Sequence, residues 1–275
     1  MDQARDITYF TDCQFKYSIC VFVTGYKPYA EMVESFVSHG FTHSDCEYLY
    51  IDNTKGDVYE AFAGINKFLT VAKGTYIIIC HQDLVLLSDG RNKLDAVLDE
   101  LARRDPNWGV CGNAGGIHPG RLAIRITDPH GDNQFTESLP AKVTSLDENF
   151  LLVRRDANLA VSRDLEGFHL YGTDLCLVAQ FLGYSSYVVD FHLRHLSRGP
   201  QDRTYQEIRS ALIAKHSRAL RLHFATTTTT SVFLGGSKAL RSVLNSRVGL
   251  RVARRLGGLA ARLRRGAAPP PAATP

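Results

Sequence analysis

The sequence lacks the cysteine spacing of disulfide scaffolds and zinc sites. Its six cysteines form no CxxC pair and no metal-ligand spacing. Several of them stand inside apolar runs, where a free thiol behaves as a small hydrophobic side chain. We therefore expect reduced, buried cysteines, as in a protein of a reducing compartment. The six are Cys13, Cys20, Cys46, Cys80, Cys111 and Cys176.

The sequence also shows no pattern typical of a signal peptide or of a membrane-spanning segment. The first ten residues contain Asp2, Arg5 and Asp6 and have no apolar core of the kind a secretory signal needs. No run of 18 or more apolar residues occurs, so no spanning helix is expected. The sequence predicts a cytoplasmic protein, peripheral at most on the inner face of the membrane.

Acidic residues are absent from the last quarter of the chain. Residues 209–275 contain 13 Lys and Arg and no Asp or Glu, whereas residues 1–208 contain 19 basic and 28 acidic residues. This asymmetry predicts two parts with different partners. The whole composition, with 44% hydrophobic and 22% charged residues, is that of an ordinary globular protein.

Three short apolar runs in the first third of the chain are typical of buried strands. They span residues 17–23, 48–51 and 76–80. Helix-like spacing of apolar residues separates them, over 28–39 and 58–72. This alternation predicts an α/β fold with a mostly parallel central sheet that helices cover on both faces.

Polar residues follow each of these three strands. Thr24, Asp52 and Asp83 all stand at carboxyl ends, which is the edge where ligands bind in open α/β sheets. Asp83 closes the segment His81-Gln82-Asp83, in which Gln82 is interpreted as a spacer. A carboxylate there suits Mg²⁺ or Mn²⁺, which neutralises a diphosphate. An Asp after a strand also serves as a turn or helix cap, so this pattern alone does not distinguish a metal ligand from a structural cap.

The rest of the chain predicts further elements and three segments. Residues 1–208 are expected to form the catalytic domain, 209–265 a basic amphipathic helical extension, and 266–275 a disordered Pro/Ala tail. Within the first segment we expect a Gly-rich bend at 112–116, a hairpin or lid at 121–135 and a helix starting near Asp174. The remaining expected elements are helix 92–103 and strands 108–111, 150–153 and 187–190.

Several stretches together resemble family 2 glycosyltransferases. They are Asp52-Asn53-Thr54, Asn66-Lys67, the run AKGTYIIICHQD at 72–83, GFHLYGTDLC at 167–176, Gly183-Tyr184 and HLRHLS at 192–197. The likeness covers about residues 17–197. It implies a GT-A nucleotide-diphospho-sugar transferase fold and an inverting, metal-dependent transfer from a nucleotide sugar, with UDP as the expected nucleotide. The implied acceptor is a saccharide or lipid-linked saccharide in cell-surface polysaccharide or lipopolysaccharide synthesis.

The resemblance also implies roles for individual residues. Thr24 would lie near the nucleobase, and Asp52 would hold uracil or ribose. Asp83 would bind the metal, with His195 as a further ligand of the metal or the diphosphate. Asp174 would be the general base that deprotonates the acceptor hydroxyl, because a helix start keeps a carboxylate ionised.

The chain departs from the family pattern at one position, where His81 replaces the first acidic residue of the motif. His81 is expected to contact ribose or a metal-bound water. Asp147, Glu148 and His169 are candidates for the acceptor side, although a cap, surface or core role explains each of them as well.

Other functions stay open for the main domain. The replacement at His81 keeps a non-catalytic nucleotide-sugar-binding scaffold as an alternative. A sugar nucleotidyltransferase would need a Gly-rich basic segment after the first strand, and Thr24-Gly25-Tyr26-Lys27-Pro28 is poor in glycine. A dinucleotide-binding dehydrogenase is not indicated, because no GxGxxG follows that strand.

The basic extension interleaves leucine and valine with arginine. Such a segment can lie on an anionic membrane surface, and an oligomerisation or solvated helix is the alternative. No aromatic residue follows Phe233, so this segment offers no aromatic side chain on which a base could stack, and no nucleic-acid partner is expected.

Overall fold

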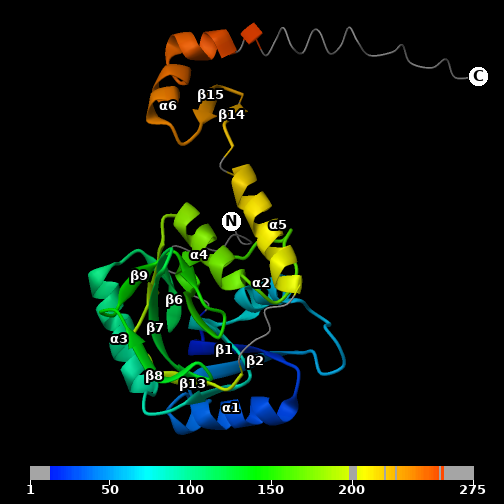
Figure 1. Ribbon diagram of the computed structural model, residues 1–275, viewed down its shortest axis with the longest axis vertical. Helices are drawn as coiled ribbons and strands as arrows, with labels where there is room; N and C mark the ends of the chain where they lie inside the picture. Colours follow the sequence, from blue (N-terminus) through cyan, green and yellow to red (C-terminus); the bar gives the residue numbers. More distant parts are fainter. Residues whose placement is uncertain (1–12, 198–202, 220, 227, 254, 257–275) are drawn as a thin grey trace, which may run out of the picture. The chain divides into compact units, whose positions relative to one another are not determined.

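The chain divides into two compact units, Met1–Leu212 and Ile213–Pro275. The computed structural model describes residues 13–197, 203–219, 221–226, 228–253 and 255–256 (Figure 1). The predicted disordered tail at 266–275 and the end of the predicted extension lie outside the described residues.

The first unit is built on a seven-stranded central sheet with the order β2-β1-β3-β11-β5-β12-β9. Five strands run in one direction, while β11 and β9 run against it. This mixed but mostly parallel sheet confirms the predicted α/β class. The strands are β1 Phe15–Val23, β2 Cys46–Asp52, β3 Gly74–Cys80, β5 Trp108–Gly112, β9 Ala141–Val143, β11 Phe150–Arg154 and β12 Ser185–Val188.

The first three strands end at the same edge of the sheet. The parallel register sets Val23 of β1 opposite Asp52 of β2, and Val21 of β1 opposite Cys80 of β3. The segments that leave β1, β2 and β3 therefore begin side by side, as the sequence predicts. This edge positions the candidate site.

Helices cover both faces of the central sheet, and α1 and α4 lie on opposite sides of it in Figure 1. The three isoleucines of β3 alternate between the faces, because successive strand side chains point in opposite directions. Ile78 packs in the core that α1 and α3 cover, whereas Ile77 and Ile79 pack in the core of α2, α4 and the first part of α5. The helices are α1 Tyr26–Ser38, α2 Ala61–Val71, α3 Arg91–Arg104, α4 Tyr171–Phe181 and α5 Arg203–Ala219.

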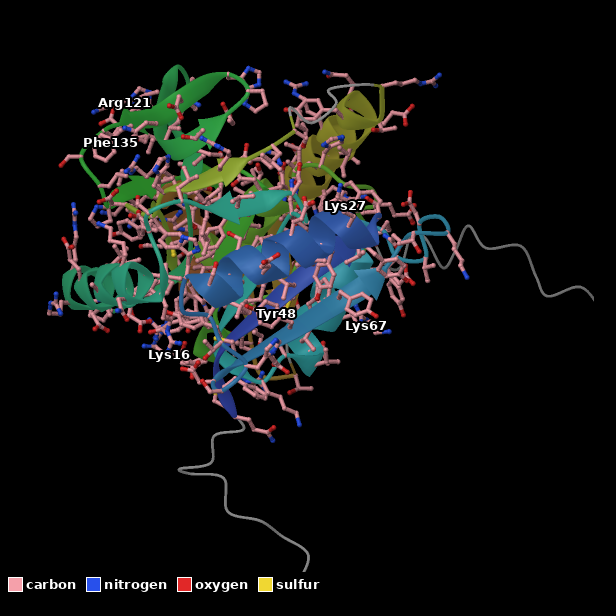
Figure 2. The ribbon with its side chains drawn as sticks, turned by 90° about the horizontal axis from the view of Figure 1, so that it is seen from below. Lys16, Lys27, Tyr48, Lys67, Arg121 and Phe135 are labelled. Atoms are coloured by element: carbon pink, nitrogen blue, oxygen red, sulfur yellow. The ribbon has the colours of Figure 1, made fainter. Side chains whose placement is uncertain are left out.

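A second sheet, of six strands, adjoins the carboxyl edge. Its order is β10-β6-β7-β13-β4, with β8 paired to β7. The β7–β8 hairpin, which carries Arg121 and Phe135 (Figure 2), confirms the hairpin predicted at 121–135. The strands are β4 Leu84–Leu86, β6 Ala114–His118, β7 Arg121–Asp128, β8 Gly131–Thr136, β10 Ser145–Leu146 and β13 Leu193–His195.

The bend predicted at 112–116 is confined to Asn113, because β5 ends at Gly112 and the glycines Gly115 and Gly116 belong to strand β6. A Cβ atom on Gly115 would lie 2.4 Å from the Ser145 carbonyl oxygen. Glycine is therefore required here for the close approach of β10 to β6, and not for a turn.

The second unit is not helical throughout, which corrects the prediction for 209–265. Strands β14 (His223–Thr226) and β15 (Ser231–Leu234) form an antiparallel pair ahead of α6 (Lys238–Leu244). The rings of Phe224 and Phe233 lie 5.1 Å apart across this pair, and Asn245 bonds both backbone groups of Phe233. Cross-strand aromatic contact of this kind stabilises a hairpin. The prediction of a helix from the spacing of basic and apolar residues does not account for this contact. Among the described parts of the chain, every helix is too short or too polar to cross a bilayer.

Candidate metal and donor site

Three potential metal ligands meet just beyond the end of β3. One ligand atom each from His81, Asp83 and His195 lies within 4.8 Å of the others, and we call this group the His-Asp-His cluster. His81 Nδ1 is 3.1 Å from His195 Nε2, which is 3.4 Å from Asp83 Oδ1. The side chains of His195 and Asp83 are 12% and 22% exposed, so the cluster is accessible but sheltered.

Strand pairing brings His195 to this place. Strand β4 begins directly after Asp83, and β13 pairs with it so that His195 is opposite Leu84. The Leu196 amide then donates a hydrogen bond to the Asp83 carbonyl oxygen at 3.2 Å. The second sheet therefore fixes the distance between two residues that are far apart in sequence.

The electrostatics of the cluster favour the ionic forms that bind a cation. Burial and then the neighbouring His195 lower the pKa of His81 to about 4, so its imidazole is neutral at physiological pH. Burial alone would raise the pKa of Asp83, but hydrogen bonds from His195 and Ser197 outweigh it and hold this pKa well below its usual range. A neutral imidazole and an ionised carboxylate are competent metal ligands.

The spacing of the donor atoms fits one metal ion. Two ligands at about 2.1 Å from the same ion lie about 3.0–3.4 Å from each other in octahedral or tetrahedral geometry. Two of the three separations in the cluster, 3.1 and 3.4 Å, match this range, and the third, between His81 and Asp83, is within 4.8 Å. The residues present therefore suit a divalent cation.

Tyr171, which sequence reasoning missed, supports the cluster from the start of α4. Its hydroxyl lies 3.3 Å from His81 Nε2 and donates to the Glu148 carbonyl oxygen, also at 3.3 Å. The side chain is only 4% exposed. A tyrosine at the beginning of a helix is ordinarily a core residue, so no sequence signal set this one apart.

Gln82 is not a spacer, contrary to the prediction from the sequence, because its side chain makes specific hydrogen bonds. Its Oε1 atom accepts hydrogen bonds from the amides of Thr24 at 3.0 Å and Gly25 at 3.1 Å. Its Nε2 atom donates to Thr24 Oγ1. Gln82 therefore ties the end of β3 to the end of β1, and it engages the hydroxyl of Thr24 that was predicted to lie near a nucleobase.

Asp52 lies exposed at the end of β2 with an aromatic neighbour. It accepts hydrogen bonds from Tyr26 Oη at 2.7 Å and from the hydroxyl of Thr54, also at 2.7 Å. These bonds lower the pKa of Asp52 to about 2, so the carboxylate is ionised. The ring of Tyr26, which is 56% exposed, stands beside it and was not among the predicted residues.

Two acidic residues precede β11 near the start of α4. Burial and then the charge of Asp147 raise the pKa of Glu148 to about 8, although the backbone amides of Leu170 and Gly172 oppose the shift. Leu170 has φ of 61°, a left-handed conformation that costs an L-residue about 1–2 kcal/mol. Such strain is often found at functional sites. Asp147 is exposed and accepts from the Asn149 amide at 3.0 Å.

Two other predicted residues have mainly internal contacts. Asp174 is fully buried, and its carboxylate accepts hydrogen bonds from the Ser162 amide at 2.7 Å and the Ser162 hydroxyl at 2.8 Å. A carboxylate held in this way has no open path to an acceptor hydroxyl, so it does not fit the expected role of general base. His169 packs edge-to-face on Tyr205 of α5, with 5.5 Å between ring centroids.

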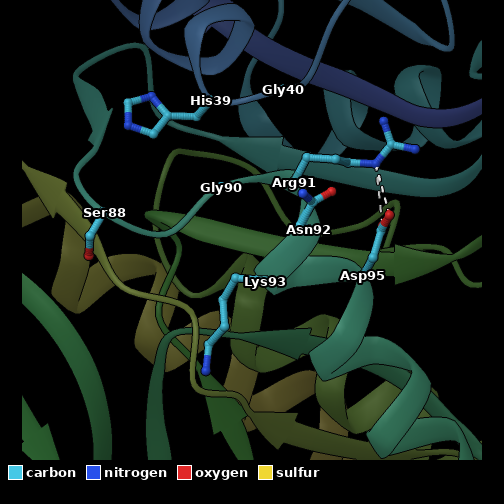
Figure 3. A pocket seen from close by; sticks show the side chains of 8 residues that line it. All are labelled: His39, Gly40, Ser88, Gly90, Arg91, Asn92, Lys93 and Asp95. Carbon is cyan, nitrogen blue, oxygen red and sulfur yellow. Dashed lines mark hydrogen bonds and ion pairs between the residues drawn. The ribbon is translucent and has the colours of Figure 1, made fainter.

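A hollow of about 650 Å³ at the start of α3 contains none of the predicted residues (Figure 3). The charged groups that line it are already paired, since Arg91 bonds Asp45 and Asp95 while Lys93 bonds Asp190. We assign this hollow no function. It is lined by His39, Gly40, Ser88, Gly90, Arg91, Asn92, Lys93 and Asp95.

The fold and the cluster define an α/β protein with a candidate divalent-metal site. No family model matches the chain. It is 37% identical over 228 residues to the protein "ATP synthase subunits region ORF 6" of Fuscovulum blasticum, a match that spans 80% of this chain and 91% of that protein. The chain belongs to the same family as that protein, whose name states no activity.

Two solved structures show more distant similarity. The mannosyltransferase PcManGT from Pyrobaculum calidifontis in complex with GDP-Man and Mn²⁺ has a TM-score of 0.49 and 14% identity, over 98% of this chain and 79% of that chain. Residues 1–349 of S. aureus TarS in complex with UDP-GlcNAc give 0.45 and 14%, over 68% and 60%. Because both TM-scores lie below 0.5, we base no assignment on them.

Proposed function

We propose that the chain is a GT-A-type, metal-dependent glycosyltransferase that transfers a sugar from a nucleotide-sugar donor to a saccharide or lipid-linked saccharide. One observation carries the proposal. The His-Asp-His cluster lies beyond β3, at the sheet edge that also bears Thr24 and Asp52. A metal ligand set beside polar strand ends suits the binding of a nucleoside diphosphate, because the ion can neutralise the phosphates.

On the donor side, each residue has a defined task. A bound divalent ion would neutralise the diphosphate and stabilise its departure. Asp52, already ionised, can accept hydrogen bonds from a ribose or uracil, and the exposed Tyr26 ring beside it offers an apolar face. Gln82 holds the Thr24 backbone, which keeps the end of β1 at a constant distance from the cluster. A UDP-sugar is the donor that the family resemblance favours.

On the acceptor side, we assign the general base to Glu148 in place of Asp174. Its carboxylate would take the proton of the acceptor hydroxyl while that oxygen attacks the anomeric carbon. The bond from the anomeric carbon to the diphosphate oxygen breaks, and the nucleoside diphosphate leaves with the electron pair. Attack from the side opposite to the leaving group inverts the anomeric centre. A base whose pKa of about 8 lies near the working pH is suited to this transfer.

The direct test measures donor turnover. Purified protein is incubated with UDP- and GDP-sugars and with Mn²⁺ or Mg²⁺, and release of the nucleoside diphosphate is followed with and without saccharide acceptors. We expect release that chelation abolishes. Binding of a nucleotide sugar without turnover of any donor would favour the scaffold alternative, and formation of pyrophosphate from a nucleoside triphosphate and a sugar phosphate would favour a nucleotidyltransferase.

We further propose that the second unit attaches peripherally to an anionic membrane, where a lipid-linked acceptor for cell-surface polysaccharide or lipopolysaccharide would be met. Its aliphatic side chains Val243, Val248, Val252 and Leu256 are 50–67% exposed. Arg241, Arg247, Arg251 and Arg255 are interleaved with them, and no acidic residue occurs beyond residue 208. Exposed aliphatic groups among cations suit the interface of an anionic bilayer.

A further inference from the structure

We propose that His81 is a direct third ligand of the metal ion, that Tyr171 holds it in the binding tautomer, and that the site therefore selects a first-row transition-metal ion over Mg²⁺. This inference rests on the proposed function and goes beyond it. The sequence motif alone left His81 as a contact to ribose or to a metal-bound water. The structure supplies a specific partner for each of its ring nitrogens.

The tautomer of His81 follows from the single proton of the Tyr171 hydroxyl. The Glu148 carbonyl oxygen can only accept, so Tyr171 donates its proton there, at 3.3 Å. The Tyr171 oxygen can then only accept from His81 Nε2, also at 3.3 Å, and Nε2 must carry the hydrogen. With its hydrogen on Nε2, the His81 ring has a lone pair on Nδ1, the atom that faces His195 in the cluster.

Lone pairs converge at this point. His81 Nδ1 lies 3.1 Å from His195 Nε2, and that nitrogen lies 3.4 Å from Asp83 Oδ1. Such an arrangement needs a positive charge or a shared proton between its members. A metal ion satisfies three donors together, whereas the one proton on His195 Nε2 can be directed fully at only one neighbour.

The start of α4 keeps Tyr171 in place. The next residue, Gly172, packs so closely that a Cβ atom there would lie 2.4 Å from the Leu146 carbonyl oxygen. Tyr171 also packs edge-to-face on Phe62, with ring centroids 6.4 Å apart. Its hydroxyl is therefore held at His81, as outer partners of metal-bound histidines usually are.

The donor set determines the class of ion. Two imidazole nitrogens and one carboxylate suit Mn²⁺, Co²⁺ or Zn²⁺, whose affinities for nitrogen donors follow the Irving–Williams order. Mg²⁺ prefers oxygen ligands in a nearly octahedral shell with several waters. Replacing the first acidic residue of the motif by His81 therefore moves the site from an oxygen-dominated set to a nitrogen-rich one.

Metal binding without nucleotide tests the ligand assignment. The metal-free protein is titrated calorimetrically with Mn²⁺ and with Mg²⁺, and pulsed electron paramagnetic resonance of the Mn²⁺ form counts the coupled imidazole nitrogens. We expect at least 100-fold tighter binding of Mn²⁺ than of Mg²⁺, with two coupled imidazoles in the wild type and one in His81→Ala. Equal affinities, absence of Mn²⁺ binding, or an unchanged count in His81→Ala would overturn the inference.

Two further variants separate positioning from folding. Tyr171→Phe removes only the hydroxyl and should weaken Mn²⁺ binding by about 10–100-fold. Tyr48→Phe is the matched control, because the Tyr48 hydroxyl (Figure 2) also donates to a backbone carbonyl, that of Phe41, away from the cluster. His81→Asp should raise the relative affinity for Mg²⁺. Equal Mn²⁺ affinity of both Tyr→Phe variants would remove Tyr171 from this role.

The outcomes for this inference and for the proposed function are distinguishable. If the protein turns over a nucleotide-sugar donor but binds Mn²⁺ equally well with and without His81, the inference is contradicted and the glycosyltransferase assignment stands. Mn²⁺ affinity that depends on His81, without turnover of any nucleotide sugar, would support the metal site and contradict the assignment.

Discussion

The two units of the chain use charge and apolar surface in opposite ways. The unit Met1–Leu212 carries 20 Lys and Arg against 28 Asp and Glu, whereas Ile213–Pro275 carries 12 against none. The first unit buries its aliphatic residues on both faces of a sheet and presents a few polar groups at one edge. The second leaves Val243, Val248 and Val252 exposed beside arginines. This difference is the basis for the proposed division, with chemistry in the first unit and attachment in the second.

The largest effect should follow from removing the carboxylate of the cluster. Asp83→Ala takes away the anionic metal ligand, and we expect sugar transfer to fall by about 10³-fold or more. Transfer is measured by release of the nucleoside diphosphate in the presence of acceptor. Binding of the same variant to anionic vesicles should be unchanged, since that surface belongs to the second unit. A loss of both properties would contradict the division of roles.

A smaller loss is expected from Glu148→Gln, about 10²-fold in kcat, because a positioned base contributes about 10²–10⁴-fold. The pH profile should identify the group. Burial raises the pKa of Glu148 to about 8, so below this pH it is mostly protonated and unable to accept a proton. The wild-type rate should therefore rise from pH 6 to about 8 and level off above it, and the variant should lack this rise.

Asp174→Asn is the control for that assignment. The Asp174 carboxylate is buried and accepts hydrogen bonds from Ser162, so the folded fraction of the variant should keep its rate of transfer. Loss of turnover in well-folded Asp174→Asn protein would return the role of base to Asp174.

The surface of the second unit offers the next test. Replacing Arg247, Arg251 and Arg255 by glutamine removes three charges worth about 1 kcal/mol each near an anionic bilayer. Sedimentation with phosphatidylserine vesicles should show that the variant binds them with about 100-fold lower affinity than the wild type. Added salt should also weaken the binding of the wild type. Turnover with a soluble acceptor should stay the same. Equal binding to neutral vesicles would argue against an electrostatic surface.

The smallest effect concerns stability of the first unit. The Asn66 side chain makes two hydrogen bonds with the backbone of Val161, at 2.9 and 3.0 Å. Asn66→Ala leaves both backbone groups without these partners and should lower the free energy of unfolding by about 2 kcal/mol. Chemical denaturation of this variant is compared with that of Lys67→Ala, an exposed neighbour, which should differ little from the wild type. Equal stability of the two variants would contradict the structural role of Asn66.

Much of the fold could be predicted because it depends on short-range patterns. The β1–β3 strands alternate with helices at short spacing, and parallel pairing of such units brings Thr24, Asp52 and Asp83 to one edge. The hairpin at 121–135 has its own turn residues. The second sheet was missed because β10 pairs with β6, and β13 with β4 and β7, across long separations in sequence.

The contacts of individual site residues were less predictable from the sequence than the helices and strands that carry them. Asp174 stands in the first turn of a helix, where a carboxylate is usually exposed, but tertiary packing buries it and brings the Ser162 hydroxyl to it. Gln82 stands between His81 and Asp83, but nothing in that motif indicates its own partners. Its bonds to Thr24 and Gly25 exist because β1 and β3 are adjacent.

The sequence by itself determined the α/β class, the sheet edge that carries Thr24, Asp52 and Asp83, and the separation of charge between the two parts of the chain, since these depend on local periodicity and composition. Only the tertiary structure decided which side chains meet there. His81, Tyr171 and His195 come together through the pairing of β13 with β4 and the packing of α4. Such contacts depend on long-range geometry, and no local pattern of residues specifies it.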